Sequence, residues 1–105
     1  MWWIAQILAI ALIAAVHTFN RWASVEGMSF AIRWLANVGG QAVAAPLFIL
    51  SYSLAPTFFQ PWFLGTGILA VLGFAASFIL FAEVITITKI LGAALALAGA
   101  VLLIL

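Results

Sequence analysis

Among the polar side chains inside the long apolar stretches of this chain, six are the candidates for a functional role. They are Gln6, His17, Asn37, Gln41, Thr66 and Ser77. In a hydrocarbon environment, amides, hydroxyls and an imidazole either hydrogen-bond neighbouring helices together or line a polar cavity. The six side chains are therefore the candidate lining of a substrate-binding chamber. The alternative interpretation is that they only tie helices to one another.

Helical spacing groups these side chains on common faces. Gln6 and His17 are joined by Ile10 and Ile13 in steps of four, three and four residues, which trace one stripe along a helix. The two amides of the second apolar stretch are one turn apart, and the two hydroxyls of the third share a face with small residues. Facing one another, the three stripes would line one shared chamber.

His17 is the only histidine, and an imidazole can exchange a proton near neutral pH. It could move a proton or hold a metal or a tetrapyrrole, although a hydrogen-bonded histidine near the membrane surface is the commoner case. A metal site needs further ligands, and the chain has no cysteine and no second histidine. We therefore predict no metal and no cofactor.

No catalytic constellation accompanies these residues. The sequence has no Ser-His-Asp order, no paired carboxylates at one site and no phosphate-binding loop. Arg33, at the start of the second apolar stretch, would either reach lipid headgroups or bind a substrate phosphate. An enzyme is therefore the function class that the sequence favours least.

The composition requires lipid as the solvent for most of the chain. Of its 105 residues, 70% are hydrophobic and 5% are charged, and the mean hydropathy is +1.42. About a quarter of the residues of a soluble domain are charged, so this chain could not cover its surface in water. The net charge of +1 argues against nucleic acid as a partner. We expect an integral membrane protein whose partner is the lipid bilayer.

Four apolar stretches separated by short breaks predict an all-α fold. It is expected to be a single domain over residues 1–105, an integral membrane bundle of four transmembrane helices. The helices are predicted at residues 2–19, 32–54, 61–82 and 90–105.

The basic residues predict an orientation. Arg21, Arg33 and Lys89 lie in or beside the first and third breaks, which must be on the same side of the membrane. The second break carries no Lys or Arg, so the positive-inside rule places both termini outside. Because only three residues set this bias, a dual or reversed orientation stays open.

The last apolar stretch carries a face of small residues instead of polar ones. Gly92, Ala96 and Gly99 recur at steps of four and three residues. Small residues let two backbones approach closely, where dispersion contacts accumulate. This face is the predicted contact with a second copy of the chain or with another small membrane protein.

The end of the chain resembles a known family. The segment Phe81–Leu103, FAEVITITKILGAALALAGAVLL, is similar to the closing signature of the drug/metabolite transporter superfamily, with a Glu ending one helix, a short turn, and two glycines seven residues apart. Gly65-Thr66-Gly67 and Glu26-Gly27 are similar to matching steps in its small multidrug resistance branch. Four helices in about this length are usual for that branch.

The resemblance implies a mechanism and an assembly. Family members of this size work as dimers, often with inverted copies, and move substrates by alternating access through a site near the membrane midplane. It also implies that Gly92 and Gly99 belong to the dimer contact. The implied location is a cell membrane, the inner membrane of a bacterium.

One departure bears on the substrate. Proton-coupled drug exporters of this branch carry a Glu midway along the first helix, whereas the window Ile10–Val16 is wholly apolar. Four-helix relatives without that Glu serve as paired subunits that flip lipid-linked sugars, and this sequence is more similar to them. We therefore expect a transporter or flippase subunit that moves an amphipathic or lipid-linked substrate as a homodimer or heterodimer. The alternative is a non-transporting accessory subunit of a larger membrane complex.

Overall fold

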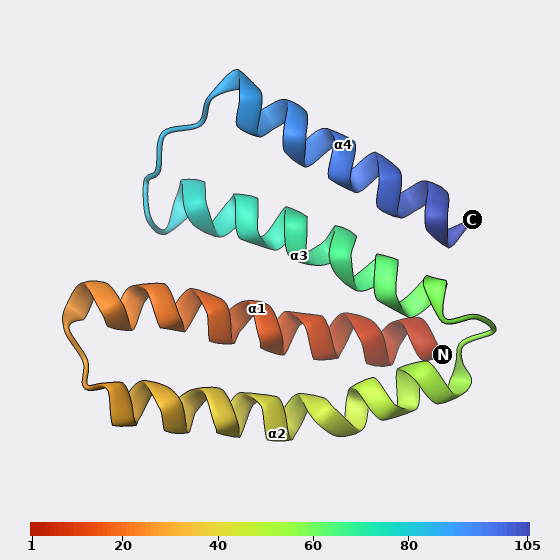
Figure 1. Cartoon of the computed structure of the whole chain (residues 1–105), viewed down its shortest axis with the longest axis horizontal. Helices are drawn as coiled ribbons and strands as arrows, with labels where there is room; N and C mark the ends of the chain where they lie inside the picture. Colours follow the sequence, from red (N-terminus) through yellow and green to blue (C-terminus); the bar gives the residue numbers. More distant parts are fainter.

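Four long helices make up almost the whole chain. The computed structural model describes all 105 residues, with α1 at Trp2–Glu26, α2 at Phe30–Leu54, α3 at Phe59–Ile79 and α4 at Ile87–Ile104 (Figure 1). Each helix is long and apolar enough to cross a membrane. The all-α class and the four membrane spans are thus as predicted, and they make the chain an integral membrane protein.

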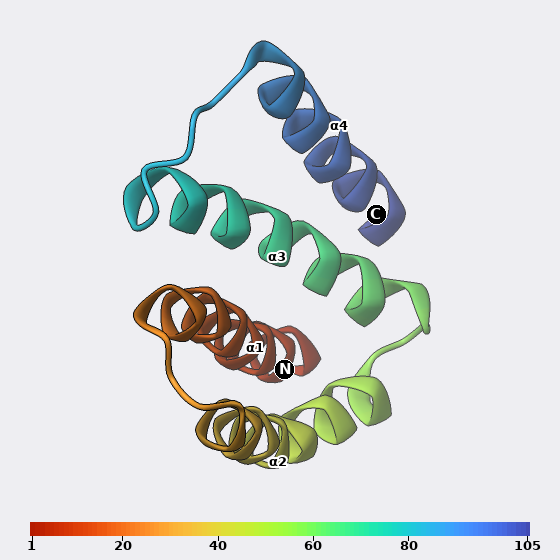
Figure 2. The ribbon, with the colours of Figure 1, turned by 60° about the vertical axis from the view of Figure 1, so that its left-hand side comes forward.

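The helices lie side by side in one curved layer, in the order α2, α1, α3, α4 (Figures 1 and 2). The Cα trace measures 43 × 36 × 15 Å, so the layer is thin relative to its length and width. The four membrane-spanning helices are those of the predicted bundle, and in the single chain they form an open layer (Figure 2). Lipid solvates apolar side chains as well as protein does, so nothing forces a layer of this kind to close on itself.

Helix α1 continues beyond the predicted end at residue 19. The polar residues after Phe19 stay helical, and the helix ends at Gly27, whose φ of +74° is left-handed. The N–H of Gly27 donates to the carbonyls of Ala23 and Ser24, which closes the last turn. The polarity of this segment therefore does not mark the end of the helix.

The other helices also shift slightly from their predicted bounds. α2 and α4 begin earlier than predicted, at hydroxyl caps, because Ser29 accepts from the Ile32 N–H and Thr86 from the Lys89 N–H. α3 ends at Ile79 and is followed by an irregular connector. In that connector Ala82 holds a positive φ of +49°.

Glycines set the closest helix contacts. A Cβ on Gly40 of α2 would collide with the Val16 side chain of α1, and a Cβ on Gly67 of α3 would lie 3.0 Å from Ala100 Cβ on α4. Neighbouring helices therefore meet where a side chain is missing, as is common in membranes. α4 packs mainly on α3, and α1 packs on both α2 and α3.

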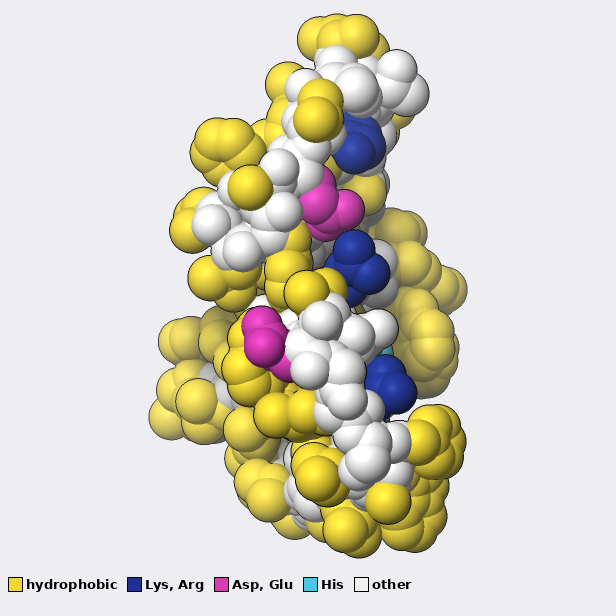
Figure 3. Space-filling model, turned by 90° about the vertical axis from the view of Figure 1, so that its left-hand side faces the viewer, with side chains coloured by type: hydrophobic (Ala, Val, Ile, Leu, Met, Phe, Trp, Pro, Cys, Tyr) yellow, Lys and Arg dark blue, Asp and Glu magenta, His cyan; other side chains and the backbone are white.

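The charged residues gather at one end of the layer. The α1–α2 and α3–α4 connections both lie at that end, and both chain termini lie at the other (Figure 1). Figure 3 looks onto the charged end and shows Lys and Arg groups interspersed with acidic ones. We call it the charged end; the positive-inside rule predicts that it faces the cytoplasm.

Candidate functional site

Gln6 is sealed between α1 and α3. Its side chain is 2% exposed, and its Nε2 donates to the Pro61 carbonyl at 2.7 Å. A Cβ on Gly65 would lie only 2.8 Å from that nitrogen, so Gly65 makes room for the amide. The Oε1 atom is buried without a partner in the chain. In the single chain, therefore, Gln6 fills a helix contact and does not face open space.

Asn37 is held by a reciprocal amide pair between α1 and α2. Asn20 Nδ2 donates to Asn37 Oδ1 at 3.0 Å, and Asn37 Nδ2 donates back to Asn20 Oδ1. Asn37 Nδ2 also donates to the Arg33 carbonyl at 2.7 Å. The pair fixes the antiparallel register of the two helices, because residues 20 and 37 must lie at the same depth.

Gln41 has no partner in the chain. Its side chain is exposed, makes no side-chain hydrogen bond, and belongs to the middle of the 25-residue helix α2. An amide at that depth meets lipid unless a second chain or a water-filled cavity covers it. Leaving an amide without a hydrogen bond in hydrocarbon costs between about 1 kcal/mol and several kcal/mol. Gln41 therefore marks a surface that needs a cover.

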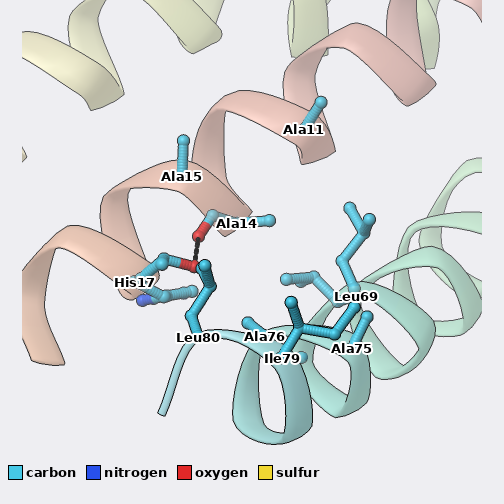
Figure 4. A pocket seen from close by; sticks show the side chains of 12 residues that line it. Ala11, Ala14, Ala15, His17, Leu69, Ala75, Ala76, Ile79 and Leu80 are labelled. Atoms are coloured by element: carbon cyan, nitrogen blue, oxygen red, sulfur yellow. Dashed lines mark hydrogen bonds between the residues drawn. The ribbon is translucent and has the colours of Figure 1, made fainter. Parts of the chain in front are cut away.

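His17 borders an apolar groove of about 470 Å³ between α1 and α3. Figure 4 shows the groove walled by Ala11, Ala14 and Ala15 from one helix and by Leu69, Ile79 and Leu80 from the other side. His17 is exposed at the rim and makes no hydrogen bond. No group of three or more metal-binding side chains is present in the structure.

The two hydroxyls of α3 do not share the groove with His17. Thr66 is exposed, and its Oγ1 donates to the Trp62 carbonyl of its own helix at 3.0 Å. Ser77 borders a different cavity of about 470 Å³ between α3 and α4, near Glu83 and Lys89. These hydroxyls lie apart from the α1–α2 amides.

The six predicted lining residues thus do not meet in one cavity of the single chain. Gln6 and Asn37 tie helices together, Thr66 bonds to its own helix, and Ser77 borders a separate cavity. His17 and Gln41 remain exposed, at similar depth, because Val16 lies against Gly40 in the antiparallel α1–α2 pair. A shared chamber would have to form between chains.

The small-residue face of α4 is unoccupied within the chain. A Cβ on Gly92 or on Gly99 would meet no atom within 4 Å, and Ala96 is exposed. α4 instead uses a neighbouring face, around Ala100, to pack on α3. Gly92, Ala96 and Gly99 are therefore free to contact another molecule.

One polar contact and one pocket were not predicted from the sequence. Gln60 Nε2 donates to the Ile104 carbonyl at 3.4 Å, which joins the start of α3 to the end of α4. A pocket of about 370 Å³ between α1 and α2 is lined by Asn20, Phe30, Arg33, Trp34 and Asn37. The only sequence signal for this pocket was the spacing of three and four residues that links Asn20 to His17 and Arg33 to Asn37. Spacing within one helix does not show that Asn20 meets Arg33, because that depends on how α1 pairs with α2.

The chain was compared with known proteins. No family model, no curated protein and no solved structure matches it.

Proposed function

We propose that this chain is one subunit of a dimeric membrane transporter or flippase of the drug/metabolite transporter type, similar to the small multidrug resistance branch. The observation that carries the proposal is Gln41, an unpartnered amide exposed at mid-helix in α2. Such an amide needs a water-filled cavity or a second chain beside it. A substrate chamber between two copies supplies both. His17 lies at a depth similar to that of Gln41 and would line the same chamber.

The shape of the chain supports a dimer. α4 packs mainly on α3, and its face of Gly92, Ala96 and Gly99 lies open. This is also the helix that resembles the closing helix of the family, in which it forms the dimer contact. A second chain of the same kind, homologous or identical, would cover the face and close the open layer into a chamber.

The chemistry of the walls favours an amphipathic or lipid-linked substrate. The window Ile10–Val16 holds no carboxylate to bind a proton or a cation in turn. The groove beside His17 is lined mostly by apolar side chains (Figure 4). A substrate with a hydrocarbon tail could keep the tail in the bilayer while its polar part passes Gln41.

Flux through proteoliposomes tests the proposal. The probes are a fluorescent polyprenyl-phosphate sugar and the organic cation tetraphenylphosphonium. We expect the lipid-linked probe to move, and Gln41→Ala to slow it at least tenfold while the assembly stays intact. Ser53→Ala is the matched control, because Ser53 is exposed on the same helix and bonds to its own Ile49 carbonyl. Intact assemblies that move neither probe would contradict the proposal.

A second candidate is a non-transporting subunit of a larger membrane complex. The open layer favours it, because both faces are largely exposed and could be covered by several neighbours. The mass of the assembly released in mild detergent separates the two. A two-chain species supports the transporter, and a larger complex of different proteins supports the accessory subunit.

A further inference from the structure

A small polar pocket opens at the charged end, between the last part of α1 and the first two turns of α2. Its volume is about 370 Å³. The residues that line it are Asn20, Phe30, Arg33, Trp34 and Asn37. It is distinct from the groove beside His17 and from the cavity beside Ser77, with which it shares no residue.

Arg33 brings a positive charge to this pocket with no acceptor for it. The side chain is half-buried, its Nε atom is buried without a partner, and no other guanidinium N–H makes a hydrogen bond in the chain. Lys89, by comparison, donates its Nζ to the Val84 carbonyl at 2.8 Å. A guanidinium carries five N–H donors in a planar fork that fits the oxygens of a phosphate. An anion with several acceptor oxygens would therefore satisfy the free N–H donors of Arg33.

The floor of the pocket offers a further donor. Asn37 Nδ2 donates to Asn20 Oδ1 and to the Arg33 carbonyl, so both of its N–H groups already have acceptors. Asn20 Nδ2 donates only once, to Asn37 Oδ1, and its second N–H is free. The Asn20–Asn37 pair is thus a fixed floor that presents one neutral donor beside the charged one.

The walls suit a molecule that is partly in the membrane. Phe30 is 75% exposed and Trp34 is 56% exposed, so both rings reach outward from the pocket. Arg33 is one turn from the start of α2, so a bilayer spanned by α2 would bring its headgroup phosphates close to this side chain. Arg21 and Lys89 at the same end keep the local charge positive despite the two acidic residues (Figure 3).

We propose that the Arg33 pocket binds the phosphate group of an anionic amphiphile. The guanidinium takes two phosphate oxygens, Asn20 donates to a third, and Phe30 and Trp34 flank the start of the hydrocarbon chain. The site needs only this α1–α2 pair, so it is independent of the dimer and of transport. If the chain binds lipid phosphate but moves no substrate, the proposed function is refuted and the proposed phosphate site is still supported.

Lipid titration followed by native mass spectrometry tests the site. The delipidated, assembled protein is titrated with dioleoyl phosphatidylglycerol and, separately, with dioleoyl phosphatidylcholine. We expect one phosphatidylglycerol per chain to bind saturably and at least tenfold more tightly than phosphatidylcholine. Arg33→Gln should weaken that binding at least tenfold. Arg21→Gln, which removes an exposed charge from the same end but outside the pocket, should change it less than twofold.

Two further arms sharpen the result. Arg33→Lys keeps the charge but loses the planar fork, so we expect an intermediate loss, and this variant also guards against a folding defect in Arg33→Gln. Displacement of the lipid by millimolar inorganic phosphate would identify the free anion as a ligand, and lack of displacement would identify the lipid. Equal losses for Arg33→Gln and Arg21→Gln, or equal binding of the two lipids, would overturn the proposal.

Discussion

At the scale of single residues, Gln6 shows how a polar side chain can serve packing instead of transport. Its amide reaches the Pro61 carbonyl at 2.7 Å across the α1–α3 contact. Gln6→Met keeps the unbranched shape and removes this hydrogen bond, so we expect a loss of about 0.5–1 kcal/mol in the free energy of unfolding in micelles. Thr66→Val is the control, since its hydroxyl bonds to its own helix. Equal effects of the two variants would contradict this assignment.

Two residues with positive φ predict stability changes of opposite sign. Gly27 has a φ of +74° and open space around it, whereas Ala82 has a φ of +49°. A Cβ is strained in the left-handed region, so Gly27→Ala should lower, and Ala82→Gly should raise, the free energy of unfolding by about 1 kcal/mol. Thermal unfolding of both variants in one detergent checks this. Shifts of the same sign would show that the two backbones are not as described.

The sequence alone could identify the polar residues but not their partners. The stripe from Gln6 to His17 was visible in the spacing, and so was the pair of amides on α2. Which amide meets which depends on the register between helices, which is set by contacts such as Gly40 against Val16. No periodicity within one helix contains that information.

At the scale of the elements, the α1–α2 contact depends on one of two adjacent glycines. A Cβ on Gly40 would collide with Val16, while a Cβ on Gly39 would meet nothing within 4 Å. Valine has one strongly preferred rotamer in a helix and cannot turn away, so Gly40→Ala should cost about 1–3 kcal/mol. Gly39→Ala should cost nothing measurable.

A compensating change makes the same contact falsifiable. Shortening the opposing side chain in the double variant Gly40→Ala with Val16→Ala should recover most of the stability lost in Gly40→Ala. The wild-type protein, Gly40→Ala, Val16→Ala and the double variant form a double-mutant cycle, and the free energy of unfolding of each is measured in micelles. Additive losses in the double variant would mean that the two side chains do not meet.

The existence of the four helices followed from hydropathy, but their ends did not. The break after Phe19 was predicted from polar residues that are in fact helical up to Glu26. A polar helical turn at a membrane surface keeps its backbone hydrogen bonds while its side chains meet water and headgroups. The local signals for the ends were Gly27 and the hydroxyl caps at Ser29 and Thr86.

At the scale of the whole molecule, the chain is an open layer with an unfilled face at one edge. A sequence with four apolar spans does not distinguish a closed bundle from such a layer, because lipid accepts either surface. Gln41 is exposed at mid-helix in α2 and the small-residue face of α4 lies open, so both lack a cover inside the chain. We therefore propose that a second chain covers them.

The most direct test is native mass spectrometry of the tagged protein released from its own membrane, with two matched variants. Gly99→Leu fills the small-residue face of α4, whereas Ala98→Leu adds bulk beside it at another exposed position of the same helix. We expect a two-chain species, either two copies or one copy with another small membrane protein. It should persist in Ala98→Leu and fall to a single chain in Gly99→Leu. A monomeric wild-type protein, or a two-chain species that survives Gly99→Leu, would contradict this expectation.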